Sequence, residues 1–177
     1  MAGRVTRPNL TLVAPNVRYR ESFLSAIAAF QREGLTWWSG GDIPLAERDF
    51  AAFVAKRRAD AQDDGSGRIP KTHLWAIVDD AFVGRIAIFH WLDDALRAVG
   101  GHIGYDTLPS MRGRGLATEM LRQALPIARG LGLSRVLLTC DDENVASIRV
   151  IEKNGGALER VFVVDGNKKK RAYWIGT

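Results

Sequence analysis

The chain has 177 residues, of which 46% are hydrophobic and 25% are charged. This length suits one domain with a sizeable core, and the composition is that of ordinary folded proteins, which excludes a wholly disordered chain. The formal net charge of +5 suits an anionic partner, which a polyphosphate cofactor satisfies as well as a nucleic acid does.

Targeting signals and metal clusters are not visible in the sequence. Residues 1–10 carry arginines with no apolar stretch behind them, and no run approaches the roughly 18 apolar residues of a membrane span. Cys140 is the single cysteine, which excludes an intrachain disulfide and a cysteine-based metal cluster. We therefore expect a cytoplasmic protein of one domain, residues 1–177, with no metal and no membrane partner.

The first half of the chain predicts two helices followed by a hairpin. A helix over residues 16–34 would bury Phe23, Ile27 and Phe30 on one stripe. The remaining predictions are a short strand over 10–13, an aromatic loop over 37–41, a helix over 44–59, strands over 74–78 and 82–91, and a loop over 92–99.

The second half alternates strands and helices. It predicts strands over 101–107 and 136–140, helices over 116–129 and 144–154, and a closing hairpin of 157–164 with 169–175. Pro126 should kink or shorten the first of these helices, because it removes a backbone hydrogen bond. The element order predicts an α/β domain with a mixed, mostly antiparallel central sheet flanked by helices, not a doubly wound parallel fold.

A basic, glycine-rich loop, Arg112-Gly113-Arg114-Gly115, lies between a predicted strand and a predicted helix. The first amides of a helix have no intrahelical partners and lie at the positive end of its dipole. Gly113 and Gly115 allow a sharp turn and a close approach of backbone to ligand, and two arginines add charge for phosphate oxygens. This placement favours a pyrophosphate site over a basic turn that only caps a helix.

Other phosphate motifs fit the loop less well. A P-loop would need Gly-Lys-Ser/Thr, and no such string is present. A dinucleotide fingerprint would need glycine at position 118, which is threonine, and a βαβ unit that does not begin there.

The loop resembles the cofactor motif of the GNAT N-acetyltransferases, Arg/Gln-x-x-Gly-x-Gly/Ala at a strand–helix junction, with Arg112, Gly115 and Ala117 at its defined positions. Residues 137–140, Asn144 and the glycines at 155–156 are similar to the family's second signature. Residues 100–105 and 150–156 resemble a bacterial subgroup of predicted acetyltransferases that has no agreed acceptor. The resemblance implies a single GNAT-type domain that uses acetyl-CoA as cosubstrate.

The resemblance also implies residue roles. Backbone groups of Thr107 and Leu108 would hold the pantetheine arm and polarise the thioester carbonyl. Asn144 would cap its helix and hydrogen-bond the cofactor. The pyrophosphate would lie on Arg112, Gly113, Arg114, Gly115, Leu116 and Ala117. An amine would attack the thioester directly in a ternary complex, so no covalent enzyme intermediate is needed.

The usual acid–base pair of the family is not visible. The position of its glutamate base corresponds to Gly101, and that of its tyrosine acid corresponds to Ile151. An ammonium acceptor must still lose a proton, and His102 and His90 lie on predicted strands and titrate in the useful range, although both could be structural. Tyr105 could act as an acid or simply pack, and Ser147 could protonate the leaving thiolate or serve its helix. Alternation puts His102 on the opposite face from Tyr105.

The acceptor is less defined than the cofactor. Trp37 and Trp38 lie in the loop that lines the acceptor pocket in the family, where they could hold a cationic or planar acceptor or only anchor the loop. We expect a small-molecule or protein amine as acceptor, and the sequence leaves a homodimer open. Two alternatives are a degenerate acyl-CoA sensor without turnover and a basic nucleic-acid binder. No recognition-helix or RNA-binding motif supports the second, so we expect no nucleic acid.

Overall fold

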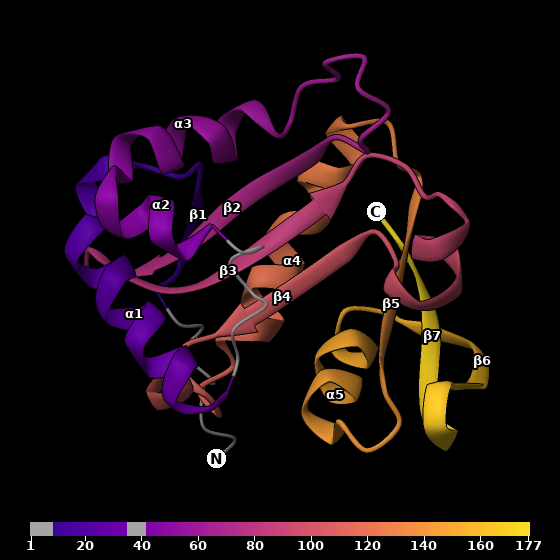
Figure 1. Ribbon diagram of the computed structural model, residues 1–177. Coiled ribbons are helices and arrows are strands. Elements are labelled where there is room, and N and C mark those ends of the chain that lie inside the picture. Colours follow the sequence, from indigo (N-terminus) through magenta and orange to yellow (C-terminus); the bar gives the residue numbers. More distant parts are fainter. Residues whose placement is uncertain (1–8, 35–41) are drawn as a thin grey trace.

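The computed structural model describes residues 9–34 and 42–177 and contains the predicted order of elements (Figure 1). The strands are β1 (Thr11–Val13), β2 (Lys71–Val78), β3 (Ala81–Phe89), β4 (Ile103–Thr107), β5 (Arg135–Asp141), β6 (Ala157–Val164) and β7 (Lys168–Gly176). The α-helices are α1 (Arg20–Arg32), α2 (Ile43–Arg48), α3 (Phe50–Ala59), α4 (Leu116–Gly130) and α5 (Val145–Lys153). Short helical turns are η1 (Val17–Tyr19), η2 (Leu96–Gly100), η3 (Pro109–Met111) and η4 (Asp165–Asn167).

The strands form two antiparallel sheets, one in the order β1-β2-β3-β4 and the other in the order β5-β7-β6. An isolated bridge between Gly101 and Leu138 joins them. Beyond this bridge, among the described strands, β4 pairs only with β3 and β5 pairs only with β7, and Figure 1 shows the two strands diverging from this point. The predicted α/β class is confirmed, with the sheet divided at a junction that we call the fork, where β4 and β5 meet at residues 101–102 and 137–138.

Helices cover both faces of the first sheet, because its strands are apolar on both sides. On one face Trp75, Ile77 and Phe82 pack with the aromatic side chains of α1 and α3. On the other face Leu74 and Ala76 pack against α4 and the second sheet. The predicted inward stripe of α1 is confirmed, since Phe23, Ile27 and Phe30 are buried. Among the described residues, no helix has both the length and the apolarity to cross a bilayer.

Three expectations about the elements were wrong in detail. The helix predicted over 44–59 is two helices, because the Asp49 side chain accepts a hydrogen bond from Ala52 N (2.9 Å) and so starts α3 anew. Pro126 does not shorten α4, which continues to Gly130 because fully buried Ala124 and Ala128 hold both sides of the proline in the core. The loop predicted over 92–99 contains the π-helical turn η2.

A buried ionic cluster joins the end of α3 to the start of β2. The carboxylate of Asp60 accepts hydrogen bonds from Arg57 Nη1 (3.0 Å) and His73 Nε2 (3.0 Å), and it lies 3.3 Å from Arg68 Nη1. Asp60 and His73 are each 8% exposed. Burial by itself would raise the pKa of Asp60, but the hydrogen bonds from His73 and Arg57 outweigh it and hold the pKa well below its ordinary value. Burial lowers the pKa of His73.

We expect this cluster to make the fold sensitive to acid. Both groups have lowered pKa values in the folded state, so the unfolded chain binds more protons and stability is lost as the pH falls, first below about 6.5 for His73 and then below about 4 for Asp60. Asp60→Asn should reduce the free energy of unfolding at pH 7 by about 1–3 kcal/mol and flatten its decline below pH 4. Urea unfolding across this pH range measures both effects. Asp63→Asn, in the exposed loop, is the matched control, and equal pH slopes for the two variants would contradict the prediction.

Candidate active site

The loop between β4 and α4 has the backbone of an anion site. Gly113 and Gly115 have φ angles of +76° and +78°, and a Cβ at either position would meet no described atom within 4 Å. Gly115 is the residue before the first turn of α4, and its own position supplies no side-chain cap for that turn. The first hydrogen bond that leads into the helix runs from Glu119 N to Gly115 O (3.1 Å). The preceding amides, including those of Leu116 and Ala117, therefore lack intrahelical partners and lie at the positive end of the dipole, as predicted.

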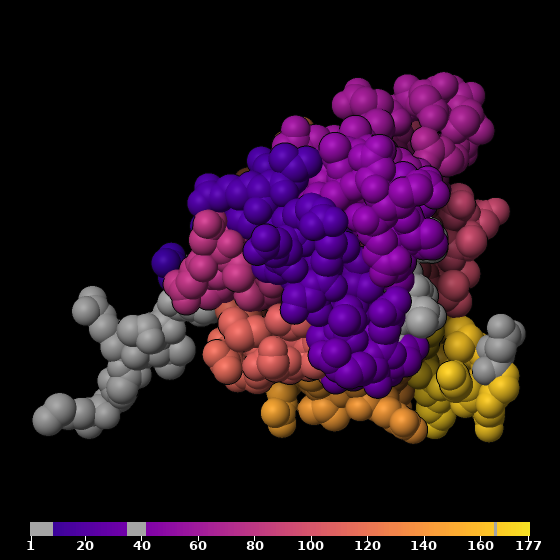
Figure 2. All heavy atoms as spheres, turned by 60° about the vertical axis from the view of Figure 1, so that its left-hand side comes forward, coloured from indigo at the N-terminus to yellow at the C-terminus, as the bar shows by residue number. Residues whose placement is uncertain are grey.

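The two arginines of the loop lie at the surface. Arg112 donates to Thr107 O (3.3 Å) and forms an ion pair with Glu33 at the end of α1 (2.8 Å). Arg114 donates to Ser110 O (3.4 Å). Figure 2 shows the segment after β4, coloured salmon, at the surface against the indigo and violet atoms of α1. The side chains of Arg112 and Glu33 are 48% and 38% exposed, and such ion pairs are weak enough for Arg112 to exchange Glu33 for a more highly charged phosphate.

Two of the four candidate catalytic residues meet beside the diverging strands. The Tyr105 hydroxyl on β4 donates to the backbone carbonyl of Ser147 on α5 across 3.5 Å. Burial raises the pKa of Tyr105 to about 12, so the phenol stays protonated at neutral pH. Thr107, two residues further along the same face of β4, has a buried hydroxyl oxygen with no hydrogen-bond partner among the described residues. An orphaned polar atom of this kind beside the cofactor loop suits a ligand that hydrogen-bonds to it.

The other predicted cofactor contacts are partly occupied. The Leu108 N–H donates to Val83 O (2.8 Å), so it is not available to polarise a thioester carbonyl in this conformation. Asn144 caps α5 as predicted, because its side chain accepts from Ser147 N (3.0 Å). That bond uses the side-chain oxygen, so the amide nitrogen of the same group can still donate to a ligand.

The histidines lie at the end of the sheet away from the phosphate loop. In the register of β3 and β4, Gly84 faces Thr107 and Ile88 faces Ile103, so residues after Phe89 adjoin the start of β4. His90 is there, half-buried, with its Nε2 atom 2.8 Å from Thr72 Oγ1, and burial lowers its pKa. His102 is 6% exposed and hydrogen-bonded to β5 at the fork. The structure therefore does not bring the histidines to Tyr105 and Ser147.

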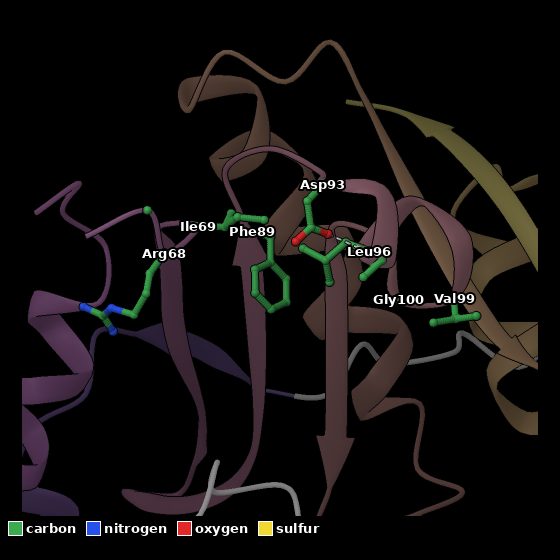
Figure 3. A pocket seen from close by; sticks show the side chains of 9 residues that line it. Arg68, Ile69, Phe89, Asp93, Leu96, Val99 and Gly100 are labelled. Atoms are coloured by element: carbon green, nitrogen blue, oxygen red, sulfur yellow. Dashed lines mark hydrogen bonds between the residues drawn. The ribbon is translucent and has the colours of Figure 1, made fainter. Parts of the chain in front are cut away.

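A hollow of about 460 Å³ opens beside the end of β3 (Figure 3). Its walls are mostly apolar and come from the segment before β2, from Phe89 and from η2, with Arg68 and Asp93 among the lining residues. In Figure 3 the ring of Phe89 lies between Ile69 and Leu96. The predicted acceptor residues Trp37 and Trp38 lie outside the described residues.

A charged pair that was not predicted from the sequence lies on the face of β4 that faces α1–α3. Asp106 accepts from Arg85 Nε (3.0 Å) and Nη2 (2.8 Å), with side chains 14% and 20% exposed. Gly104 lies two residues before Asp106, is exposed, and has no described atom within 4 Å of the place of a Cβ. Strand alternation over 103–107 was the available signal, since it separates Gly104 and Asp106 from Ile103 and Tyr105.

The two departures from the GNAT acid–base pair have structural reasons. Gly101 has a φ angle of +86°, and a Cβ there would lie 2.5 Å from Leu137 O, so no larger residue fits without moving the fork. Ile151 is 1% exposed and belongs to the core between α4 and α5. A carboxylate or phenol at either position would have to displace packed structure.

These features define an α/β domain with a basic, glycine-rich loop at the start of α4, beside two diverging edge strands. The family model described as "Acetyltransferase (GNAT) domain" matches residues 9–157. The chain therefore belongs to the GNAT acetyltransferase family, as the resemblance indicated. No curated protein sequence matches it.

Solved structures of acetyltransferases share the fold at low sequence identity. The microcin C7 self-immunity acetyltransferase MccE, in complex with acetyl-CoA and AMP, has a TM-score of 0.69 and 18% identity over 98% of this chain and 94% of its own. A GNAT-family acetyltransferase from Bacillus anthracis has a TM-score of 0.65 and 21% identity over 97% of this chain and 96% of its own. RimL, a ribosomal L7/L12 α-N-protein acetyltransferase in complex with coenzyme A, has a TM-score of 0.63 and 16% identity over 98% of this chain and 96% of its own.

Proposed function

We propose that the protein transfers the acetyl group of acetyl-CoA to a primary amine by direct attack in a ternary complex. The observation that carries this proposal is the uncapped start of α4, whose free amides follow two surface arginines of the same loop next to the edge of β4. The coenzyme A and acetyl-CoA bound by RimL and MccE support the choice of cofactor.

The cofactor would follow the loop and then the strand. The amides of residues 113–117 would take the pyrophosphate, with Arg112 and Arg114 on its outer oxygens. The pantetheine arm carries two amide groups, which suit the free edge of β4 in the way an added strand would. The orphaned Thr107 hydroxyl and the amide of Asn144 would be further polar contacts.

Chemistry would occur beyond the fork, between the diverging strands and beside Gly104 and Tyr105 of β4. The ammonium first loses a proton to solvent water, and the neutral nitrogen attacks the carbonyl carbon of the thioester, so that the C–N bond forms. The C–S bond then breaks to leave a thiolate, and the remaining proton on the new nitrogen passes through water to the solvent or to the thiolate.

Tyr105 would turn its hydroxyl from the Ser147 carbonyl, a long contact of 3.5 Å, and donate the hydrogen bond to the sulfur as negative charge develops there. The Ser147 hydroxyl is the second candidate donor. We place the acceptor over exposed Gly104, on the face that carries Asp106, because no side chain at position 104 obstructs its approach there. Trp37 and Trp38 remain candidates for its outer contacts.

The proposal is tested with the full chain, acetyl-CoA and a panel of primary amines that includes small polyamines, amino-acid amides and peptide N-termini. We expect acetyl-CoA at about 100 times its Kd to stabilise the protein by about 2.7 kcal/mol in a thermal-shift assay. We also expect an amine-dependent release of free thiol above the background of hydrolysis.

The same assay separates the alternative function, an acyl-CoA sensor. The absence of an acidic residue at position 101 and of a tyrosine at position 151 favours that alternative. A sensor would be stabilised by acetyl-CoA and release no thiol with any amine. No stabilisation by acetyl-CoA, coenzyme A or acyl-CoA homologues would overturn both functions.

A further inference from the structure

His102 is the side chain that ties the two sheets together at the fork. Its backbone N–H donates to Leu137 O (2.7 Å), and its ring Nδ1 accepts from Leu137 N–H (2.9 Å). One residue at the start of β4 thus satisfies both backbone groups of one residue of β5. A further tie at the junction runs from Thr139 Oγ1 to the carbonyls of Val99 (2.7 Å) and Gly100 (3.1 Å).

The hydrogen bond from Leu137 fixes the tautomer of the ring. A ring nitrogen that accepts from an amide N–H carries no proton, so the neutral imidazole of His102 has its proton on Nε2. The ring can therefore act as a base only at Nδ1, the atom already committed to Leu137. Protonation of Nδ1 would bring its hydrogen against the amide hydrogen of Leu137 and leave the Leu137 N–H without an acceptor.

The surroundings of the ring disfavour its charged form. Burial lowers the pKa of His102, and the positive charge of Arg97 on η2 lowers it further. The centre of the Trp174 ring lies 6.1 Å from the centre of the imidazole, and the guanidinium of Arg135 lies over the Trp174 ring. Four charged groups of the described residues are linked to the ring or to its neighbours. Arg97 lies on η2 and Arg135 on β5. On β6, Glu159 accepts from Trp174 Nε1 and Arg160 donates to Arg97 O. Three of these four groups are cationic.

We infer that His102 is a positioning residue that works as a neutral clamp, through Nδ1, and not as the base of the reaction. The clamp fixes the point from which β4 and β5 diverge. Tyr105 follows three residues later on β4, and its 3.5 Å hydrogen bond to Ser147 depends on where that strand lies relative to α5. The positioning of Tyr105 for catalysis rests on the proposed acetyl transfer, because the fork would then set the spacing of the cofactor contacts.

Three variants separate the clamp from proton transfer. Asparagine at 102 puts an amide oxygen near the place of Nδ1, glutamine puts an amide near the place of Nε2, and leucine offers neither. For a clamp, His102→Asn should keep the KM for acetyl-CoA and kcat within about threefold of the wild type. His102→Gln and His102→Leu should raise this KM about tenfold, the effect of losing one buried hydrogen bond.

The pH profile gives a second readout that a merely structural role would not move. The readout is the Kd for acetyl-CoA, measured without an amine so that ionisation of the acceptor plays no part. Since the clamp needs the neutral ring and the pKa of His102 is lowered, the wild-type Kd should rise in acid solution with a midpoint below pH 6.5. His102→Asn should lack that rise. Glutamine restoring activity where asparagine does not, or a wild-type midpoint at or above pH 6.5, would overturn the inference.

A measurement on the wild-type chain without cofactor keeps the clamp testable if acetyl transfer itself fails. The chain has three histidines, so the ring nitrogens can be assigned by ¹⁵N NMR against His102→Asn. We expect His102 to show an unprotonated Nδ1 and a protonated Nε2 at pH 7, with a titration midpoint below the ordinary histidine value of about 6.5. A proton on Nδ1 at pH 7 contradicts the clamp whatever the enzyme assay shows.

Discussion

Gly115→Glu should abolish acetyl-CoA binding while leaving the protein folded. The substitution puts a carboxylate at the start of α4, where the helix dipole and free amides now favour an anion. It removes room for phosphate oxygens and adds like-charge repulsion. Loss of two charge-assisted hydrogen bonds alone amounts to about 3 kcal/mol, so we expect the Kd for acetyl-CoA to rise at least about 100-fold. Isothermal titration of both proteins with acetyl-CoA measures the change.

Gly132→Glu is the matched control, because it carries the same charge and the same backbone strain at the other end of α4. Gly132 has a φ angle of +87°, and like Gly115 it has no described atom within 4 Å of a Cβ. Both variants should lose similar stability from a left-handed non-glycine residue, about 1–2 kcal/mol. Equal losses of affinity in the two variants would show that Gly115→Glu acts through the fold, and unchanged affinity in Gly115→Glu would remove the loop from the cofactor site.

Tyr105→Phe should lower kcat about 100-fold with little change in the KM for acetyl-CoA. The phenol has a pKa of about 12, far above the roughly 8.5 of an ordinary thiol, so full proton transfer to the thiolate is uphill. Tyr105 would instead stabilise the developing charge as a hydrogen-bond donor, and removal of one such donor typically costs about 10²–10³-fold, or about 2.7–4 kcal/mol. Steady-state kinetics with saturating amine measures the effect.

Ser147→Ala is the control for this assignment. Tyr105 bonds to the backbone carbonyl of Ser147, so alanine keeps that contact and removes only the hydroxyl. A kcat near the wild-type value in Ser147→Ala, with a large loss in Tyr105→Phe, identifies the phenol as the donor. The reverse pattern would transfer the role to Ser147. Because the phenol stays protonated until about pH 12, kcat of the wild type should show no alkaline decline from Tyr105 below pH 10.

The sequence was most informative where structure and chemistry depend on neighbours along the chain. The loop of residues 112–117 was predicted with its glycines, arginines and helix start, because each of these acts through local backbone conformation. Asn144 was predicted as a cap for the same reason, and the stripe of Phe23, Ile27 and Phe30 followed from helical periodicity. Helix breaks were less predictable, since the cap at Asp49 and the passage through Pro126 depend on how the flanking turns are buried.

Contacts between segments far apart in the chain could not be predicted from the sequence. His102 and His90 were singled out by residue type, but their partners, Leu137 and Thr72, are decided by strand pairing. Tertiary packing likewise decides that Glu33 pairs with Arg112, 79 residues away, and that Arg85 pairs with Asp106, 21 residues away.

The order of elements, the family and the basic, glycine-rich loop at the start of α4 all follow from the amino-acid sequence. Three features follow only from the folded chain: β4 and β5 diverge from one junction, Tyr105 reaches Ser147, and a backbone amide holds the ring of His102. The physical reason is that a residue's type sets what its atoms can donate or accept, whereas the packing of segments far apart in the chain sets which partner each atom meets and whether water can replace it.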